Sequence, residues 1–303
     1  MGYLHKDKEQ FREAIDLTAY QTNIMAQAVE KDYYVTLILR LLAEKVPFVV
    51  FKGGTSLSKC HQVIRRFSED IDITIDTTLS QGQKKKLKEA ISGIADELGM
   101  KILNLDETRS RRDYNRYIIS YDTVLPTHDR TLQTAVLIET SFTTISFPTV
   151  IMAVHNYIGE MMSTEAPGMM DEYLLSPFEM KVQGIDRTLT DKIFAICDYY
   201  MQSKVKKHSR HLYDIYKLLP LVPQDDDFHQ LVLEVRAVRA KSVICPSAQP
   251  NVDIPSLLKE IIQKEVYRID YEDLTSRLLE ENIDYGTVIE AVAVIAENHM
   301  FEK

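Results

Sequence analysis

Cysteine, long apolar runs and internal repeats are scarce or absent in this chain of 303 residues. The three cysteines, Cys60, Cys197 and Cys245, are odd in number and are not spaced like zinc ligands. No apolar segment approaches the roughly 20 residues that span a membrane, and the first residues do not have the pattern of a signal peptide. These absences argue against a disulfide scaffold and a membrane protein, and they predict a protein of the reducing cytoplasm.

Positive charge is also in short supply. Lysine and arginine total 36 against 45 aspartates and glutamates, so the net charge is −9. Such a chain does not coat nucleic acid over a broad surface, and a nucleic-acid substrate would need local basic patches. Two clusters qualify: Arg109-Ser-Arg-Arg112 with Arg116, and the segment Lys204–Arg210. Each also fits a solvated loop or the charged end of a helix.

Alternating side chains over residues 69–76 predict a strand with acidic residues on one face. Asp70, Asp72, Thr74 and Asp76 would share that face, opposite Ile71, Ile73 and Ile75. Two carboxylates about 5 Å apart repel each other by roughly 3 kcal/mol at an effective dielectric of about 20. A hard divalent cation with oxygen ligands offsets this repulsion. Water would do the same if the residues formed the outer face of an edge strand.

A glycine turn precedes this strand. Residues 47–52 form a short apolar run that predicts a buried strand. The segment Lys52-Gly-Gly-Thr-Ser56 follows, and its glycines permit close approaches that a β-carbon would block. We expect Thr55 or Ser56 to cap a helix that continues to about His61. Amides at such a helix start, with a lysine beside them, can bind phosphate, although the Walker pattern is absent.

The remaining pattern predicts an α+β protein whose C-terminal region is mainly helical. Helices are expected over 6–45, 83–98, 151–163, 188–203, 209–219, 226–242, 255–267, 271–281 and 285–300, and strands over 101–105, 115–124 and 132–143. The break at Pro167-Gly168 suggests two domains, 1–168 and 169–303. Within the strand 132–143, Glu139 is a carboxylate among apolar residues, which is costly if it is buried without a partner. A glutamate facing water at the strand end fits equally well.

Five segments, in this order, carry a family resemblance. They are Glu30-Lys-Asp-Tyr-Tyr34, Phe51-Lys-Gly-Gly-Thr-Ser-Leu57, Phe67-Ser-Glu-Asp-Ile-Asp72, Arg187-Thr-Leu-Thr-Asp-Lys192 and Arg210-His-Leu-Tyr-Asp214. In these the chain resembles the AbiEii/AbiGii-type nucleotidyltransferase toxins of type IV toxin–antitoxin and abortive-infection systems, which act in phage defence. The resemblance implies a DNA-polymerase-β-like core, a mixed sheet flanked by helices, with a helical C-terminal domain that completes the active site.

The resemblance also implies roles for individual residues. The catalytic residues would be Asp70, Asp72, Glu139, Lys192 and Asp214, and the nucleotide would be bound by Lys52, Gly53, Gly54, Thr55, Ser56, Ser68, Lys192 and Arg210. Asp70, Asp72 and Glu139 would hold Mg²⁺, with Mn²⁺ as the alternative metal. Asp76 and Asp122 are alternatives for the third carboxylate.

Without the resemblance, the later residues have ordinary interpretations. Lys192 would be a solvated helical lysine. Arg210 and Asp214 would form a surface pair at i, i+4 spacing, worth about 0.2–0.5 kcal/mol. Asp191 stands where the family usually has glutamate.

The implied activity is transfer of a nucleoside monophosphate from a nucleoside triphosphate to an acceptor hydroxyl, with release of pyrophosphate. The resemblance favours a tRNA acceptor end as the acceptor, reached through the basic patches, with blocked translation as the outcome and a cognate antitoxin as partner. A small molecule or a protein side chain is the alternative acceptor. A non-catalytic nucleotide- or partner-binding module is a further alternative, against which the presence of Asp70 and Asp72 argues.

Overall fold

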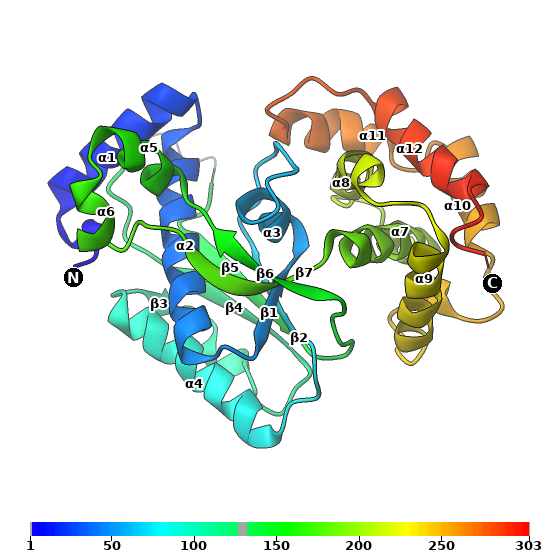
Figure 1. The fold of residues 1–303 in the computed structure, drawn as a ribbon, viewed down its shortest axis with the longest axis horizontal. Coiled ribbons are helices and arrows are strands. Elements are labelled where there is room, and N and C mark those ends of the chain that lie inside the picture. Colours follow the sequence, from blue (N-terminus) through cyan, green and yellow to red (C-terminus); the bar gives the residue numbers. More distant parts are fainter. Residues whose placement is uncertain (1, 127–131, 303) are drawn as a thin grey trace. The chain divides into compact units, whose positions relative to one another are not determined.

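The computed structural model describes residues 2–126 and 132–302, which divide into two compact units (Figure 1). The first, here called the sheet unit, comprises Met1–Cys60, Ser68–Ile145 and Thr149–Val182. The second, the helical unit, comprises His61–Phe67, Ser146–Pro148 and Gln183–Lys303. The chain therefore passes between the units several times.

The sheet unit contains a seven-stranded sheet among the described residues, in the order β3-β4-β5-β2-β1-β7-β6. Its strands are β1 (Val49–Lys52), β2 (Ile71–Ile75), β3 (Lys101–Ile102), β4 (Tyr114–Ser120), β5 (Ala135–Ser141), β6 (Thr149–Val154) and β7 (Phe178–Gln183). Strand β1 is parallel to β7 and β2 is parallel to β5, whereas the pairs β1–β2, β3–β4 and β4–β5 are antiparallel. The sheet is mixed and is flanked by helices, which confirms the predicted α+β class.

Strand β7 also explains where the sheet unit ends. The sequence suggests a boundary at residue 168, whereas residues 169–182 belong to the sheet unit. They do so because β7 pairs with β1, with Phe51 opposite Val182. The expected domains 1–168 and 169–303 therefore differ from the observed units by residues 169–182 and by the two short segments 61–67 and 146–148.

Six helices of the sheet unit lie beside the sheet among the described residues. They are α1 (Lys8–Thr22), α2 (Ala26–Lys45), α3 (Gly53–Lys59), α4 (Gln81–Glu97), α5 (Tyr157–Glu165) and α6 (Gly168–Glu172). The single helix expected over 6–45 is two helices, because Asn23 adopts a left-handed conformation with φ of 57° and ends α1. Helix α4 begins with a capping box: the Ser80 side chain accepts a hydrogen bond from Gln83 N. This cap was not predicted from the sequence.

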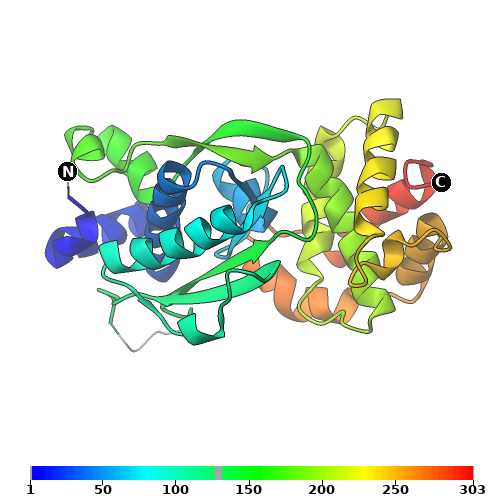
Figure 2. The same cartoon turned by 90° about the horizontal axis from the view of Figure 1, so that it is seen from below.

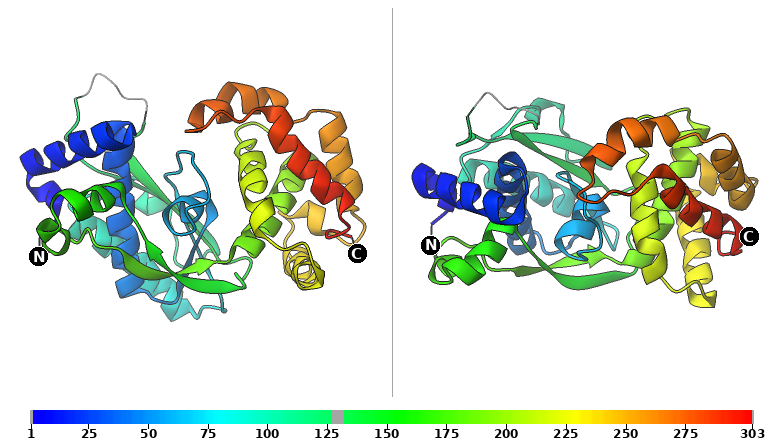
Figure 3. Two further views of the ribbon diagram at one scale, coloured as in Figure 1. Left: turned by 45° about the horizontal axis from the view of Figure 1, so that its top comes forward. Right: turned by 90° about the horizontal axis from the view of Figure 1, so that it is seen from above.

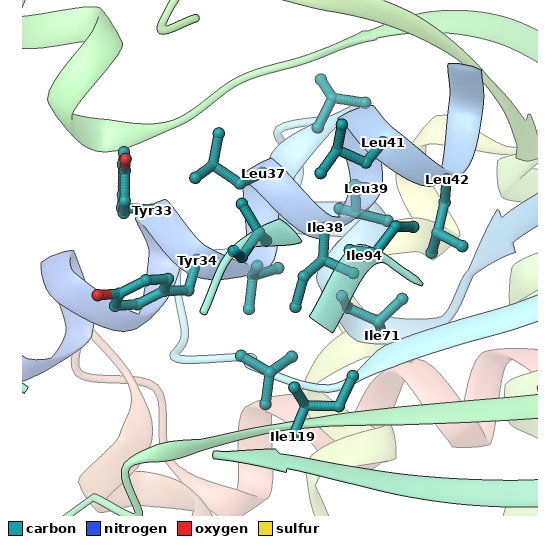
Figure 4. Close-up of a cluster of buried hydrophobic side chains, with 14 of the residues drawn as sticks. Tyr33, Tyr34, Leu37, Ile38, Leu39, Leu41, Leu42, Ile71, Ile94 and Ile119 are labelled. Atoms are coloured by element: carbon teal, nitrogen blue, oxygen red, sulfur yellow. The ribbon is translucent and has the colours of Figure 1, made fainter. Parts of the chain in front are cut away.

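One face of the sheet is apolar and forms the core. Cross-strand partners project to the same face, and the pairs Phe51–Ile73, Ile71–Ile138 and Tyr117–Ile138 consist of buried residues. Figure 4 shows the cluster that covers this face: Leu37, Ile38 and Leu42 of α2, Ile94 of α4, Ile71 of β2 and Ile119 of β4. With this face buried, the register directs Asp72 and its neighbours to the opposite face.

Strands β6 and β7, side by side at one edge of the sheet, differ from the sequence expectations (Figures 1 and 2). Residues 151–154 were expected to be helical but belong to β6, and the helix α5 begins only at Tyr157, after Asn156 caps it by accepting from Gly159 N. The expectation was wrong because β-branched Val150 and Ile151 favour a strand. Strand β7 has alternating apolar residues at Phe178, Met180 and Val182, a period-2 signal that the sequence interpretation missed.

The helical unit follows the predicted pattern closely (Figure 3). Its helices are α7 (Ile185–Met201), α8 (Arg210–Leu218), α9 (Asp226–Arg239), α10 (Ile254–Gln263), α11 (Arg268–Asp270) and α12 (Tyr285–Glu297). The helix expected over 271–281 is instead a π turn at Tyr271–Thr275 and a 3₁₀ turn at Ser276–Leu278. Within residues 2–126 and 132–302, no helix has the length and apolar character needed to cross a membrane.

Candidate active site

A row of charged side chains crosses four strands of the sheet on the face opposite the core. Lys52 of β1 is the cross-strand partner of Asp72 of β2, and Asp72 is the partner of Glu139 of β5. Glu139 is in turn the partner of Arg116 of β4, whose Nε lies 3.8 Å from Glu139 Oε1. Paired residues share a face. The sheet register therefore brings two of the three expected carboxylates side by side, with a cation at each end of the row.

Asp70 lies just outside the hydrogen-bonded strand, one residue before β2 begins at Ile71. Its Oδ1 atom is buried and has no hydrogen-bond partner among the described residues. A buried carboxylate oxygen without a partner is costly. A cation bound at this point would remove that cost, so Asp70 fits the metal-ligand role that the sequence assigns to it.

The carboxylates do not form a complete metal cage. In the described part of the chain, no three histidine, cysteine, aspartate or glutamate side chains are grouped so that they could hold a metal ion. Mg²⁺ is typically bound by one or two carboxylates together with substrate phosphates and water. Asp70 and Asp72 suit that mode, in which a triphosphate supplies the missing oxygen ligands.

The glycine turn packs directly against Asp72. Gly53 has a φ of +84°, and a β-carbon at this position would lie 2.0 Å from Asp72 Oδ2. Only glycine permits both the backbone conformation and this approach. Helix α3 then begins at Gly53 with Lys52 as its N-cap, so the expected caps, Thr55 and Ser56, lie inside the helix. The cap prediction was wrong because the turn into the helix is made at Gly53 itself.

The hydroxyl groups near the turn bind to one another and to the backbone. Thr55 Oγ1 lies 3.0 Å from Ser68 Oγ, and the Ser56 hydroxyl donates to Gly53 O at 2.9 Å. Thr55 and Ser56 are buried, whereas Ser68 is partly exposed. The contact between Thr55 and Ser68 joins the glycine turn to the segment that leads into Asp70.

Glu139 is neither buried nor alone. Its side chain is 37% exposed, Arg116 faces it, and the Tyr114 hydroxyl is hydrogen-bonded to it. Partial burial and the Glu139 carboxylate raise the pKa of Tyr114 to about 12. The cost of a buried, unpaired carboxylate does not arise here, because the side chain projects to the charged face. Sequence spacing gave no signal for Tyr114 and Arg116 as neighbours of Glu139, since they lie on a different strand.

The two alternatives for the third carboxylate lie in other surroundings. Asp76 follows the last residue of β2, at the opposite end of the strand from Asp70, and accepts a hydrogen bond from Lys181 Nζ at 2.6 Å. Asp122 is exposed, after the end of β4. Neither is in the row that contains Asp72, which favours Glu139 as the third carboxylate.

In the helical unit, Asp214 of α8 is fully buried between two cations. Arg66 Nε and Nη2 donate to its two carboxylate oxygens at 2.7 and 2.9 Å. Lys192 Nζ of α7 lies 2.8 Å from Asp214 Oδ2. The alternative interpretation of Arg210 and Asp214 as a surface pair is therefore wrong, because Asp214 is buried and is paired with Arg66 and Lys192. The sequence interpretation missed Arg66, although it directly precedes Phe67 of a quoted segment.

Charges in this buried group perturb one another. Burial opposes ionisation of Asp214, but Arg66 and Lys192 outweigh it and hold the pKa of this carboxyl far below its usual value. Burial lowers the pKa of Lys192, against the effect of Asp214. Burial and the neighbouring Lys192 and Arg210 keep the pKa of His211 well below normal, and its Nδ1 lies 3.2 Å from Lys192 Nζ. A neutral His211 and an ionised Asp214 thus orient the Lys192 ammonium.

Asp191 faces away from this group and ties α7 to α9. Its Oδ2 lies 3.1 Å from Arg187 Nε, and its Oδ1 lies 3.0 Å from Arg239 Nη1. Arg239 also binds Asp198 at 2.8 Å. Asp191 therefore has a structural role, and an aspartate side chain is long enough to contact both Arg187 and Arg239.

The basic patches are held by local hydrogen bonds. Arg109 donates to Asp106 O and Thr108 O, and Arg112 donates to Glu107 O, so these two arginines brace their own loop. In the second patch, the amides of Lys207 and Ser209 donate to the carboxylate of Asp270. Arg116 is the member of the first patch that reaches the row of charges.

Comparisons with known proteins agree with this architecture. A family model described as nucleotidyl transferase AbiEii toxin, type IV TA system, matches residues 37–298. Among solved structures, MenT4, the nucleotidyltransferase toxin Rv2826c from Mycobacterium tuberculosis H37Rv, is similar with a TM-score of 0.50 and 14% sequence identity. The match covers 95% of this chain and 90% of that chain, and at this identity it supports the fold alone. No curated protein sequence matches the chain.

Proposed function

The chain belongs to the AbiEii nucleotidyl transferase toxin family of type IV toxin–antitoxin systems, and from this premise we propose that it transfers a nucleoside monophosphate from a nucleoside triphosphate to an RNA hydroxyl. The favoured acceptor is the acceptor end of a tRNA, whose modification blocks translation. Membership of a toxin family implies a cognate antitoxin that restrains the activity.

The arrangement of the carboxylates beside the glycine turn carries the proposal. Asp72 and Glu139 are cross-strand partners, Asp70 precedes Asp72 with a buried, unpartnered Oδ1, and Gly53 packs against Asp72. Carboxylates placed together beside a tight glycine turn suit metal-assisted phosphoryl chemistry better than a passive binding surface, since their mutual repulsion needs a cation.

Asp70 and Asp72 would hold Mg²⁺, and Glu139, the cross-strand partner of Asp72, would be the third carboxylate. When bound, a divalent ion neutralises charge on the triphosphate and makes the acceptor hydroxyl a better nucleophile. Mn²⁺ prefers similar oxygen ligands, so it is the natural substitute in experiments.

The remaining residues bind and orient the substrate. Lys52 and the backbone around Gly53–Ser56 bind phosphate oxygens, with Ser68 beside the turn, and Lys192 and Arg210 contribute further positive charge. The acceptor oxygen bonds to the α-phosphorus, and the bond from that phosphorus to the bridging oxygen breaks. Pyrophosphate leaves with the bond electrons, and Glu139 takes the hydroxyl proton. Asp214 contributes by orienting Lys192, which it contacts at 2.8 Å.

The acceptor strand would lie against β4. Tyr114 is 48% exposed and the Arg116 side chain 51% exposed, and both contact or face Glu139. An exposed aromatic ring can stack on a base, and an arginine can bind a backbone phosphate. Their position next to the third carboxylate favours a nucleic-acid acceptor over a small hydroxylated molecule.

A labelling experiment tests the reaction class. Purified protein is incubated with Mg²⁺, total cellular RNA and each of the four α-labelled nucleoside triphosphates in turn. We expect label on a tRNA-sized band with wild-type protein and none with the Asp70→Ala, Asp72→Ala double variant. Asp16→Asn, which changes an exposed carboxylate paired with Arg12 on α1, serves as the matched control and should label RNA normally.

Two results would contradict the proposal. Full labelling by the double variant would show that these carboxylates are not required. Label on a small molecule or on a protein, with none on RNA, would move the acceptor to the alternative class while leaving the transfer chemistry intact.

A further inference from the structure

Three consecutive charged residues of α2, Glu30, Lys31 and Asp32, are largely withdrawn from solvent. Glu30 is 1% exposed and Lys31 is 2% exposed, and the Asp32 side chain is 11% exposed. Burial of a charge is expensive unless the charge is paired and hydrogen-bonded. Each of the three must therefore have partners, and the partners show what this part of the helix does.

Each residue of this triplet holds a different segment of the sheet unit. Glu30 accepts from the Thr123 hydroxyl and from Val124 N, after β4. Asp32 accepts from Lys59 Nζ at the end of α3. Lys31 Nζ lies 2.5 Å from Glu69 Oε2 and donates to Gln133 O at 3.3 Å. Lys31 thus joins the residues that lead into β2 and β5, the strands of Asp72 and Glu139.

The contact with Glu69 matters because Asp70 lies outside the sheet ladder. The pairing of β2 with β5 begins at Ile71, and its pairing with β1 ends at Asp72. Backbone hydrogen bonds of the sheet therefore do not fix the residue that carries the buried, unpartnered Oδ1. The adjoining contacts are that of Glu69 with Lys31 and that of Ser68 with Thr55.

We propose that Lys31 is a positioning residue for the Asp70 carboxylate: by holding Glu69 it fixes the backbone at the start of β2 and so sets the distance between Asp70 and Asp72. This inference rests on the proposed function, in which these two carboxylates bind a divalent cation. Mutation of a residue that orients a metal ligand without touching the metal typically lowers metal affinity by about 10- to 100-fold.

Lys31 could position Asp70 or could merely balance the charge of the acidic residues. The two roles predict opposite effects of Lys31→Met on cation affinity. If Lys31 only balanced charge, Lys31→Met would leave the acidic residues more negative and would tighten cation binding. If Lys31 positions Asp70, the same change loosens the carboxylate pair and weakens binding. The measurement is a titration of the full chain with Mn²⁺ alone, in which free Mn²⁺ is followed by its electron paramagnetic resonance signal.

We expect Lys31→Met to weaken Mn²⁺ binding by about tenfold or more. Lys181→Met is the matched control, because Lys181 holds Asp76, just past the other end of β2, through a similar ion pair at 2.6 Å. It should leave the Mn²⁺ affinity within about twofold, since Asp76 lies outside the row that contains Asp72 and no metal-ligand contact is lost.

A double variant separates positioning from stability. Glu69→Ala combined with Lys31→Met removes both charges of the ion pair, so Glu69 is no longer left without its cation, and thermal stability should recover relative to Lys31→Met alone. Mn²⁺ affinity should remain as low as in the single variant, because both changes break the same contact. If Lys31→Met does not fold, Glu69→Ala alone carries the test, since the Glu69 side chain is 29% exposed and its loss is better tolerated.

Unchanged or tighter Mn²⁺ binding in Lys31→Met, or in Glu69→Ala if that variant is used, would overturn the proposal. So would recovery of affinity together with stability in the double variant, since that result describes a purely structural residue. If the wild-type chain binds no Mn²⁺ by itself, the titrations are repeated with a non-hydrolysable nucleoside triphosphate, which supplies the missing oxygen ligands. Absence of Mn²⁺ binding by the wild-type chain in that experiment is a distinguishable outcome: it would remove the metal site of the proposed function and the inference with it.

Discussion

At the scale of single residues, Gly53 leaves no room for a side chain. Its φ of +84° disfavours any residue with a side chain, and a β-carbon would lie 2.0 Å from Asp72 Oδ2. Gly53→Ala should therefore lower the free energy of unfolding by about 1–3 kcal/mol. It should also reduce transfer by about a hundredfold or more, because Asp72 must move. Urea unfolding and labelling rates measure the two effects.

Gly93→Ala is the control for this prediction. Gly93 lies within α4, and no heavy atom is within 4 Å of the place where its β-carbon would lie. Alanine should stabilise that helix by about 0.5–1 kcal/mol and leave transfer unchanged. A Gly53→Ala protein as stable and active as wild type would show that Asp72 is not held by this contact.

Arg116 is the residue whose loss should affect the acceptor selectively. Its side chain is 51% exposed, so Arg116→Ala should hardly change stability. Loss of one charge-assisted phosphate contact, worth about 1.5 kcal/mol at the lower end of its range, should raise KM for the RNA acceptor about tenfold. KM for the nucleoside triphosphate should stay constant. Arg12→Ala, an exposed arginine of α1, is the control; a change in triphosphate KM alone would argue against an acceptor contact at β4.

At the scale of elements, the buried group around Asp214 joins segment 61–67, α7 and α8. Arg66→Met would leave Asp214 with Lys192 as its remaining close cationic partner in the helical unit, and breaking a buried pair in this way costs about 3–5 kcal/mol. Lys217→Met offers the comparison, because the pair Lys217–Glu281 is about one-quarter exposed and lies 3.0 Å apart. That change should cost less than about 1 kcal/mol. Urea unfolding of both variants tests the contrast, and equal losses would contradict it.

Helices and strands were predictable where their own sequence carries a clear periodicity or glycine punctuation. Helices α7 to α10 and α12 were expected within a few residues of their bounds, and so were β1 and β2, because periodicity and glycine punctuation lie within each segment. Strand β6 was mistaken for a helix and β7 was missed. Both carry a local strand signal, but each signal spans only a few residues. Their place in the sheet depends on the pairing of β7 with β1 and with β6, which local sequence does not report.

The same distinction applies to the candidate site. The alternation around Asp70 and Asp72 and the glycine turn are local signals, so the sequence alone makes these residues candidates. The burial of Asp214 was not foreseen, because its partner Arg66 is 148 residues away in sequence. Tyr114 and Arg116 join Glu139 only through the register of β4 with β5. Long-range partners of charged residues are thus what the structure adds.

At the scale of the whole molecule, each unit contains a histidine that resists protonation, half-buried His5 in one and buried His211 in the other. In the sheet unit, burial and Lys6 lower the pKa of His5 to about 4; its Nε2 donates to Leu98 O, and its Nδ1 accepts from the Tyr33 hydroxyl. In the helical unit, burial, Lys192 and Arg210 lower the pKa of His211. An unfolded chain has both imidazoles near their usual value of about 6.5.

The pH dependence of stability follows from these shifts. Below about pH 6.5 the unfolded chain binds protons that the folded chain does not, so the free energy of unfolding must fall as the pH falls. For His5 the loss continues to a pH of about 4. Glu30 and Glu160, whose pKa values are raised chiefly by burial, work in the opposite direction. A variant is therefore needed to isolate one histidine.

His5→Gln keeps a donor for Leu98 O but does not titrate. Between pH 6.5 and 5, the wild type should lose at most about 2 kcal/mol more than this variant, at 1.36 kcal/mol per pKa unit. Urea unfolding of both proteins at pH 7.0 and 5.0 measures the difference. The sign of the difference in unfolding free energy decides the test. If the wild type gains stability relative to the variant on acidification, His5 is protonated in the folded state, and the prediction is wrong.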